Sequence, residues 1–349
     1  MILPLETFRG IFALIIVLHH LKIDTFIQNS KIIMNGGLVV DFFFVLSGFV
    51  ISLNYLHKIK TKDQLFLFQK KRFKRLYPLH ILTLLIFVFI EFIKLIVNNF
   101  TNLESTYEPF GDFNNLYSLV ANFFLLHGWY GWSYNLPSWS ISTEFYTYFI
   151  FGLIILISTN KLRFILSAIF FALIILLLNN FDIKKFDFLI YPARCIYSFF
   201  LGVIVYLIYE KFKSHLSYWF SLFLIIGSFA IIILSDQLPY NYKYIFAPII
   251  FGFTILFVSK LNQDSLLYRF LSNKFTVYLG SISYGIYMIH FAFVWFFRQF
   301  SKYLLNIPDN EIGFLSFNNY LGEFFTLVFV IFIIFVSHIS LHYFENKFR

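Results

Sequence analysis

The chain has 349 residues, of which 59% are apolar, 23% aromatic and only 13% charged. Soluble domains carry about 25% charged residues, so this composition excludes an ordinary soluble domain and indicates a polytopic protein of the lipid bilayer. The formal net charge of +9 fits basic residues gathered at the inner membrane surface, and we expect no nucleic-acid partner. The single cysteine, Cys195, excludes an intrachain disulfide and a cysteine-based metal site, and we expect no bound metal.

Ten segments are long and apolar enough for a membrane span, which needs roughly 20 apolar residues. We therefore predict an all-α fold of about ten transmembrane helices. They are expected at about residues 7–24, 38–56, 76–98, 137–158, 162–180, 188–209, 216–234, 242–259, 276–297 and 320–342. The first lacks the basic start and the cleavage site of a signal peptide, so we expect it to be retained. Residues 1–349 are expected to form a single transmembrane domain with no appended soluble domain.

Basic residues set the expected orientation of the spans. Residues 57–75 hold eight Lys and Arg and one Asp, whereas residues 99–136 hold no Lys or Arg. Because cytoplasmic loops carry the excess of Lys and Arg, the first segment is predicted to be a cytoplasmic loop and the second an outer loop. Both chain termini are then cytoplasmic. Lys184 and Lys185 form a mild exception on the outer side.

The apolar and aromatic stretch at 116–132 belongs to this outer loop. We interpret it as a helix at the membrane interface, where Trp and Tyr prefer to lie. The alternative is an eleventh span, which would invert every later loop and remove the charge bias.

The first span carries two polar side chains that are unfavourable in lipid. Arg9 and His20 are eleven residues apart, close to three helical turns, so they share one face about 16 Å apart along the axis. Histidine is the side chain best suited to accept a proton near neutral pH, which makes His20 a candidate general base. The alternative is structural: Arg9 reaches the inner headgroups and His20 hydrogen-bonds a neighbouring helix.

Two carboxyl groups are expected within the membrane. Asp41 enters with the second span about one turn below the outer surface, and Glu144 lies about 10 Å inside the fourth. Either carboxylate can orient an imidazole and stabilise its protonated form, although Asp41 can also be a hydrated interfacial group. The pair Ser47-Gly48 in mid-span is expected to let two helices approach closely.

A basic element precedes the third span. Arg72 and Arg75 share one helix face, and Pro78 is expected just inside the helix start. Two forked guanidiniums beside a helix start match the oxygens of a phosphate; the alternative is topology charge or contact with anionic lipid. Later spans carry Ser140 beside Glu144, and Ser283, Tyr284, Tyr287 and His290 at helical spacing. Tyr and His at such positions usually tie helices together.

In this order the residues resemble the motifs of the membrane acyltransferase-3 family, which includes bacterial O-acetylases of surface polysaccharides. The family's first motif is a basic residue separated by ten residues from a histidine, and Arg9 and His20 match this spacing. Residues 41–49 match its acidic, phenylalanine-rich element. Three further elements, R-x-x-R-x-x-P, W-S-x-x-x-E and S-Y-x-x-Y-x-x-H, are matched at 72–78, 139–144 and 283–290, and a C-terminal element is matched weakly at 343–345. The stretch from about 160 to 275 matches mainly in hydrophobicity.

The resemblance implies ten spans, a cytoplasmic acyl-CoA donor, commonly acetyl-CoA, and an acceptor hydroxyl presented from the outer side. It also favours phosphate contacts for the two arginines. We therefore expect a bacterial inner-membrane O-acyltransferase that modifies a cell-surface or exported polysaccharide or glycolipid. Its donor would be acetyl-CoA, another acyl-CoA being possible, and no tightly bound cofactor is expected.

The expected site joins these residues into one path. The catalytic residues are His20, Asp41 and Glu144, the donor-binding residues are Arg9, Arg72 and Arg75, and Ser140, Tyr284 and His290 line the site. The nucleotide would contact the arginines while the pantetheine arm reaches towards His20. An alternative from another class is a transporter or flippase in which the polar groups form a substrate or proton path, although the repeat symmetry common in transporters is not evident.

Overall fold

The computed structural model describes most of the chain as a set of packed helices. The described residues are 2–101, 108–111, 113–130, 132–157, 160, 162–180, 189–212, 214–239, 241–311 and 313–348. Their regular structure is helical, and no β-strand forms among them. The predicted all-α fold is therefore confirmed. Lys184, Lys185 and parts of the predicted outer loop lie outside the described residues.

Each of the ten predicted spans coincides with a long helix. These are α1 (Leu3–Leu21), α3 (Val39–Tyr55), α4 (Lys62–Phe100), α7 (Trp139–Ile157), α8 (Leu162–Asn180), α9 (Ile190–Lys211), α10 (Tyr218–Leu234), α11 (Lys243–Ser259), α13 (Lys274–Tyr303) and α14 (Asn319–Ile339). Seven of them, α1, α3, α4, α7, α9, α13 and α14, are long and apolar enough to cross a membrane. The chain is thus a multi-pass membrane protein. The apolar stretches of α8, α10 and α11 are shorter, so the count of ten crossings stays a prediction.

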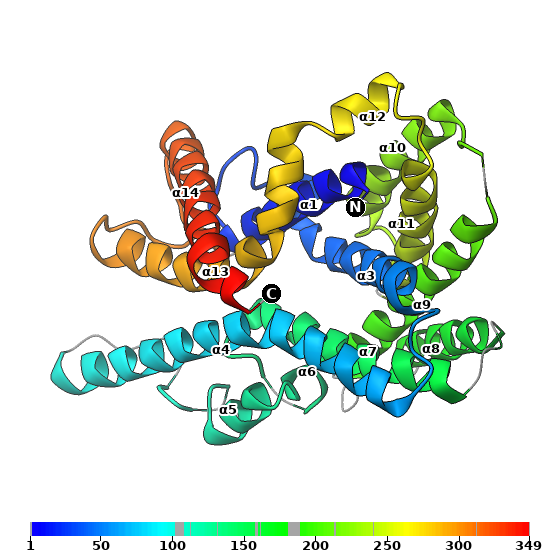
Figure 1. Cartoon of the computed structure of the whole chain (residues 1–349). Helices are drawn as coiled ribbons and strands as arrows, with labels where there is room; N and C mark the ends of the chain where they lie inside the picture. Colours follow the sequence, from blue (N-terminus) through cyan, green and yellow to red (C-terminus); the bar gives the residue numbers. More distant parts are fainter. Residues whose placement is uncertain are drawn as a thin grey trace.

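Helices α1 and α3 lie at the centre of the bundle (Figure 1). α1 packs against α13, and α3 packs against α9. α14 lies beside α13 on one side, α10 and α11 lie on the other, and α4 and α7 run together along a third. Arg9 and His20 lie on α1, and Asp41 lies on α3. Because both helices are central, these polar groups face other helices.

Close backbone contacts fix the two central crossings. A Cβ on Gly48 of α3 would lie 1.9 Å from the carbonyl oxygen of Phe199 on α9. A Cβ on Gly280 of α13 would lie 2.2 Å from the carbonyl oxygen of Glu6 on α1. Only glycine lets two helix backbones approach this closely. The predicted close approach at Gly48 is confirmed.

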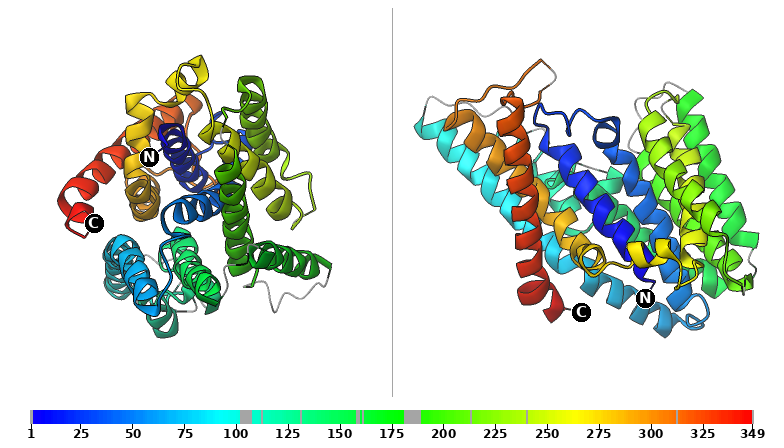
Figure 2. Two further views of the ribbon diagram at one scale, coloured as in Figure 1. Left: turned by 45° about the vertical axis from the view of Figure 1, so that its right-hand side comes forward. Right: turned by 90° about the horizontal axis from the view of Figure 1, so that it is seen from above.

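Both chain termini lie at the same end of the bundle, as the right-hand view of Figure 2 shows. An even number of crossings returns the chain to the side on which it began. The arrangement therefore fits the predicted topology, while the cytoplasmic location of the two termini stays a prediction.

The basic segment at 57–75 was predicted to be a loop, and this prediction is wrong for most of its length. Helix α4 begins at Lys62 and continues for 39 residues. Leu65 and Phe68 are three residues apart and both are buried. They give the charged stretch an apolar face with helical spacing, which supports a helix. Pro78 consequently lies inside α4 and not near its start.

The segment at 116–132 forms two short helices, α5 (Leu116–Phe123) and α6 (His127–Tyr130). An eight-residue helix is about 12 Å long, far less than the ~30 Å hydrocarbon core. The described part of this segment therefore does not form an eleventh span. Leu116 and Tyr117 are exposed on α5, which fits the predicted interfacial location without testing it.

Candidate active site

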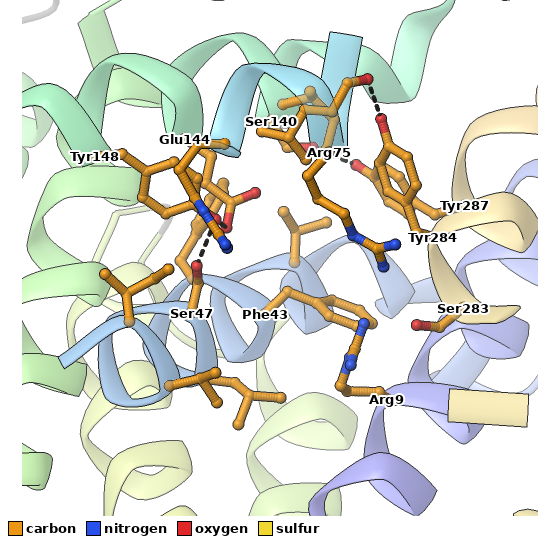
Figure 3. Close-up of a pocket in the computed structure, with 18 of the residues that line it drawn as sticks. Arg9, Phe43, Ser47, Arg75, Ser140, Glu144, Tyr148, Ser283, Tyr284 and Tyr287 are labelled. Atoms are coloured by element: carbon orange, nitrogen blue, oxygen red, sulfur yellow. Dashed lines mark hydrogen bonds between the residues drawn. The ribbon is translucent and has the colours of Figure 1, made fainter. Parts of the chain in front are cut away.

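A cavity of about 260 Å³ opens between α1, α3, α4, α7 and α13 (Figure 3). Its polar lining comprises three arginines, two glutamates, three serines and three tyrosines: Arg9, Arg72, Arg75, Glu6, Glu144, Ser47, Ser140, Ser283, Tyr148, Tyr284 and Tyr287. Six of the residues predicted for the site lie in this lining, namely Arg9, Arg72, Arg75, Ser140, Glu144 and Tyr284. His20, Asp41 and His290 are not part of it.

The arginines reach the cavity from two helices. Arg72 and Arg75 lie one turn apart on α4, as their spacing predicts, and Figure 3 shows the guanidiniums of Arg9 and Arg75 directed into the cavity. The Arg72 guanidinium lies over the ring of Tyr55, 5.4 Å from its centroid. Its Nε is buried and has no hydrogen-bond partner within the described ranges. A buried donor without a protein partner is available to a ligand.

Carboxylates and a tyrosine ring hold the other two arginines. Arg9 forms an ion pair of 2.8 Å with Glu6, one turn earlier on α1. Arg75 Nη1 lies 3.8 Å from Oε2 of Glu345, which follows α14, and its guanidinium lies 5.5 Å from the ring centroid of Tyr284. The guanidiniums are thus oriented before any ligand binds, which lowers the entropy lost on binding.

A short hydrogen-bonded chain forms the opposite wall. The Tyr148 hydroxyl donates to Glu144 Oε1 at 2.5 Å and lies 2.8 Å from Ser47 Oγ. All three side chains line the cavity. Polar groups inside a membrane span mark a functional site by default, and these groups offer both donors and acceptors to an extended polar ligand.

Tyr287 connects the cavity to the histidines. Its hydroxyl donates to the carbonyl oxygen of Pro137 at 2.8 Å and lies 2.7 Å from Ser140 Oγ. Its ring centroid lies 6.2 Å from that of His290, three residues further along α13. Tyr287 therefore lines the cavity, and its ring also lies next to the imidazole of His290.

His20 and His290 form a hydrogen-bonded pair between α1 and α13. Nδ1 of His20 lies 3.0 Å from Nε2 of His290. His290 is fully buried, whereas His20 is partly exposed. The imidazole predicted to act as a general base therefore has a second imidazole as its partner.

Asp41 is not that partner. Its carboxylate is fully buried and pairs with Arg194 on α9 at 2.7 Å. Glu144 accepts its hydrogen bond from Tyr148 instead. The prediction that Asp41 or Glu144 orients His20 is therefore wrong, because position along a helix gives the depth of a side chain but not the neighbour that its face meets.

Two residues of this polar network were missed in the sequence. Arg194 is the only arginine of its span, and a charged side chain inside a membrane helix marks a paired or functional position, which would have singled out Arg194 without naming its partner. Glu6 precedes Arg9 by three residues, a spacing that brings opposite charges together on a helix. Both signals were present in the sequence.

Comparison with known proteins identifies the family. The family model of the acyltransferase domain, acyltransferase-3, matches residues 3–340. Acyltransferase MdmB of Streptomyces mycarofaciens is 33% identical over 123 residues, which are 34% of this chain and 28% of that protein. Proteins of Staphylococcus aureus strains COL and MSSA476, each named "Putative O-acetyltransferase", are 25% identical over 331 residues, which cover 85% of this chain and 51% of theirs. No solved structure matches the chain.

This chain therefore spans about half the length, or less, of the curated relatives that it matches. The matched range 3–340 includes every residue that lines the cavity and both members of the histidine pair. The sequence motifs indicated the family correctly: this multi-pass membrane protein belongs to the acyltransferase-3 family.

Proposed function

We propose that this chain is an O-acyltransferase that moves an acetyl group from cytoplasmic acetyl-CoA to a hydroxyl of a cell-surface or exported polysaccharide or glycolipid. The observation that carries the proposal is the cavity, which combines three guanidiniums with the buried chain of Glu144, Tyr148 and Ser47. Membership of the acyltransferase family supports acyl transfer. The names of the Staphylococcus aureus relatives support acetyl as the group and oxygen as its acceptor.

The donor is proposed to bind with its phosphates at Arg72 and Arg75. Forked guanidinium donors match phosphate oxygens, and the unpartnered Nε of Arg72 supports this role. Sites for drug-sized ligands measure about 300–1,000 Å³, so a cavity of about 260 Å³ suits the pantetheine arm and not the whole nucleotide. The adenosine part would remain outside, at the end where α4 begins.

Acetyl transfer is proposed to take place at the Tyr287 end of the cavity, next to the histidine pair. The acceptor oxygen attacks the thioester carbonyl carbon, so a C–O bond forms and the C–S bond breaks. His20 takes the hydroxyl proton and passes it to the departing thiolate of CoA. General base action of this kind contributes about 10²–10⁴-fold to the rate.

The proposed orientation places ten helices across a bacterial inner membrane with both termini in the cytoplasm. The position of both termini at one end of the bundle supports it, as does the basic first part of α4. Donor and acceptor would then enter from opposite sides of the membrane.

The test is donor binding and turnover by the protein in lipid nanodiscs. Acetyl-CoA is titrated by calorimetry, and release of CoA thiol is followed without an acceptor, since the chain matches only half the length of its relatives. We expect saturable binding and slow thiol release, in which water takes the place of the acceptor hydroxyl and the acetyl group leaves as acetate. Folded protein that neither binds nor cleaves acetyl-CoA would overturn the proposal.

The alternative function is that of a transporter or flippase. No particular observation among the described residues favours it. The same experiment separates the two functions, because a flippase would leave acetyl-CoA unbound and intact. Mass spectrometry of surface glycans with and without the gene would then identify the acceptor.

A further inference from the structure

The hydrogen bonds of His290 define the protonation of both imidazoles. Nδ1 of His290 lies 3.1 Å from the carbonyl oxygen of Ile286 on the same helix. A carbonyl oxygen only accepts hydrogen bonds, so Nδ1 of His290 carries a hydrogen. In a neutral imidazole the other nitrogen, Nε2, is then an acceptor. The nitrogen that faces it at 3.0 Å is Nδ1 of His20, which must therefore be the donor.

The neutral state of His290 follows from its surroundings. The side chain is fully buried, and neither ring of the pair hydrogen-bonds a carboxylate in the part of the chain that the structure describes. A buried charge without a partner is strongly disfavoured. His20 consequently holds its hydrogen on Nδ1, and its Nε2 keeps a free lone pair.

The neighbouring histidine does not take this place. His19 Nδ1 lies 2.9 Å from the carbonyl oxygen of Ile33, whereas the nitrogen at hydrogen-bond distance from His20 Nδ1 is Nε2 of His290. The His20 ring is further confined by Phe291, whose centroid lies 5.4 Å away at an interplanar angle of 76°. His290 and Phe291 are consecutive on α13, so one helix holds the His20 ring by a hydrogen bond and by an aromatic contact.

We propose that His290 is the positioning residue of the acyl-transfer site: it fixes His20 as the Nδ1–H tautomer and directs the lone pair of Nε2 to the acceptor hydroxyl. This inference rests on the proposed function. His290 fills the place that a carboxylate occupies in other histidine-based sites, and it does so without a charge inside the membrane. When Nε2 of His20 takes the hydroxyl proton, the Nδ1–H···Nε2 hydrogen bond spreads the positive charge over both rings until the thiolate of CoA accepts that proton.

The test compares two amides at position 290. The oxygen of His290→Gln can stand near the place of Nε2 and accept from His20, whereas the shorter His290→Asn places its oxygen near Nδ1. We expect His290→Asn to lower kcat for acetyl-CoA by about 10²-fold or more, with an unchanged KM, and His290→Gln to recover most of the rate. His342→Gln is the matched control, because exposed His342 makes the same contact to a carbonyl four residues earlier but has no hydrogen-bond donor at Nε2 among the described residues.

A second readout does not depend on activity. The nitrogen-15 chemical shifts of the ring of His20, assigned by their loss in His20→Gln, report which nitrogen carries the hydrogen. Wild type and His290→Gln should show Nδ1–H, and His290→Asn should show a mixture of tautomers. An Nε2–H tautomer in the wild type, or equal kcat for the two amide variants, would overturn the role of His290. If the wild type shows the Nδ1–H tautomer but does not cleave acetyl-CoA, the proposed function fails and the pairing stands.

Discussion

Asp41 and Arg194 form an ion pair inside the bundle, with Arg194 Nη2 at 2.7 Å from Asp41 Oδ2. Asp41 is fully buried and Arg194 is 5% exposed. The guanidinium also lies 3.7 Å from the ring centroid of Tyr244 on α11. One arginine therefore ties α9 to α3 and to α11, and we interpret Asp41 as a structural residue and not as a catalytic one.

Removal of either charge should destabilise the protein. Loss of one partner from a buried ion pair leaves an uncompensated charge, which costs about 3–5 kcal/mol. We expect Asp41→Asn and Arg194→Met each to lower the melting temperature in detergent strongly. The double variant Asp41→Leu with Arg194→Met should recover much of the loss, because apolar replacement of a whole buried pair is often neutral.

The double variant also tests the catalytic role predicted for Asp41. If the pair is structural, the folded double variant cleaves acetyl-CoA at nearly the wild-type rate. A double variant that melts normally but has lost turnover would return Asp41 to the active site.

The features predicted correctly from the sequence were those that are set within a single helix. Apolar length gave the ten helices, and the spacing of Arg72 and Arg75 placed both side chains on the cavity wall. The partner of Asp41 could not be obtained in this way, since it depends on how α3 and α9 are rotated against each other. The first turns of α4 were missed for a different reason. The many charged residues of this segment predicted a loop, although Leu65 and Phe68 give it a buried apolar face.

The histidine pair illustrates the same limit. The sequence predicted His20 and His290 as site residues of different spans but gave no reason to join them. They meet because α1 and α13 pack along each other, from the contact of Gly280 with Glu6 to the histidine pair. That packing is a property of two helix surfaces and not of either helix alone.

His20→Ala should nearly abolish acetyl transfer while the protein remains inserted. Loss of a general base typically lowers the rate by about 10²–10⁴-fold. Since His20 does not line the cavity, calorimetry should find acetyl-CoA binding almost unchanged. Full turnover by His20→Ala would exclude His20 from the reaction, and loss of binding would place the imidazole in the donor site.

Arg72→Gln and Arg75→Gln should weaken donor binding. A hydrogen bond to a charged group contributes about 1.5–3 kcal/mol, so KM for acetyl-CoA should rise roughly 10- to 100-fold with a smaller change in kcat. Lys71→Gln and Lys74→Gln are the matched controls, because these lysines lie on the same helix and are exposed away from the cavity. Equal effects of all four variants would indicate general attraction by a basic surface and would contradict specific phosphate contacts.

Gly48→Ala should destabilise the protein through the crossing of α3 and α9. The new Cβ would lie 1.9 Å from the carbonyl oxygen of Phe199, so the two backbones must separate, and overpacking of this kind typically costs about 1–3 kcal/mol. Gly227→Ala on α10 is the control, since its nearest atom would be a side-chain carbon of Ile250 at 3.9 Å. Alanine is a better helix former than glycine by up to about 1 kcal/mol, so Gly227→Ala should keep or raise the melting temperature. Equal melting temperatures for the two variants would show that the helices separate freely and that Gly48 does not fix this crossing.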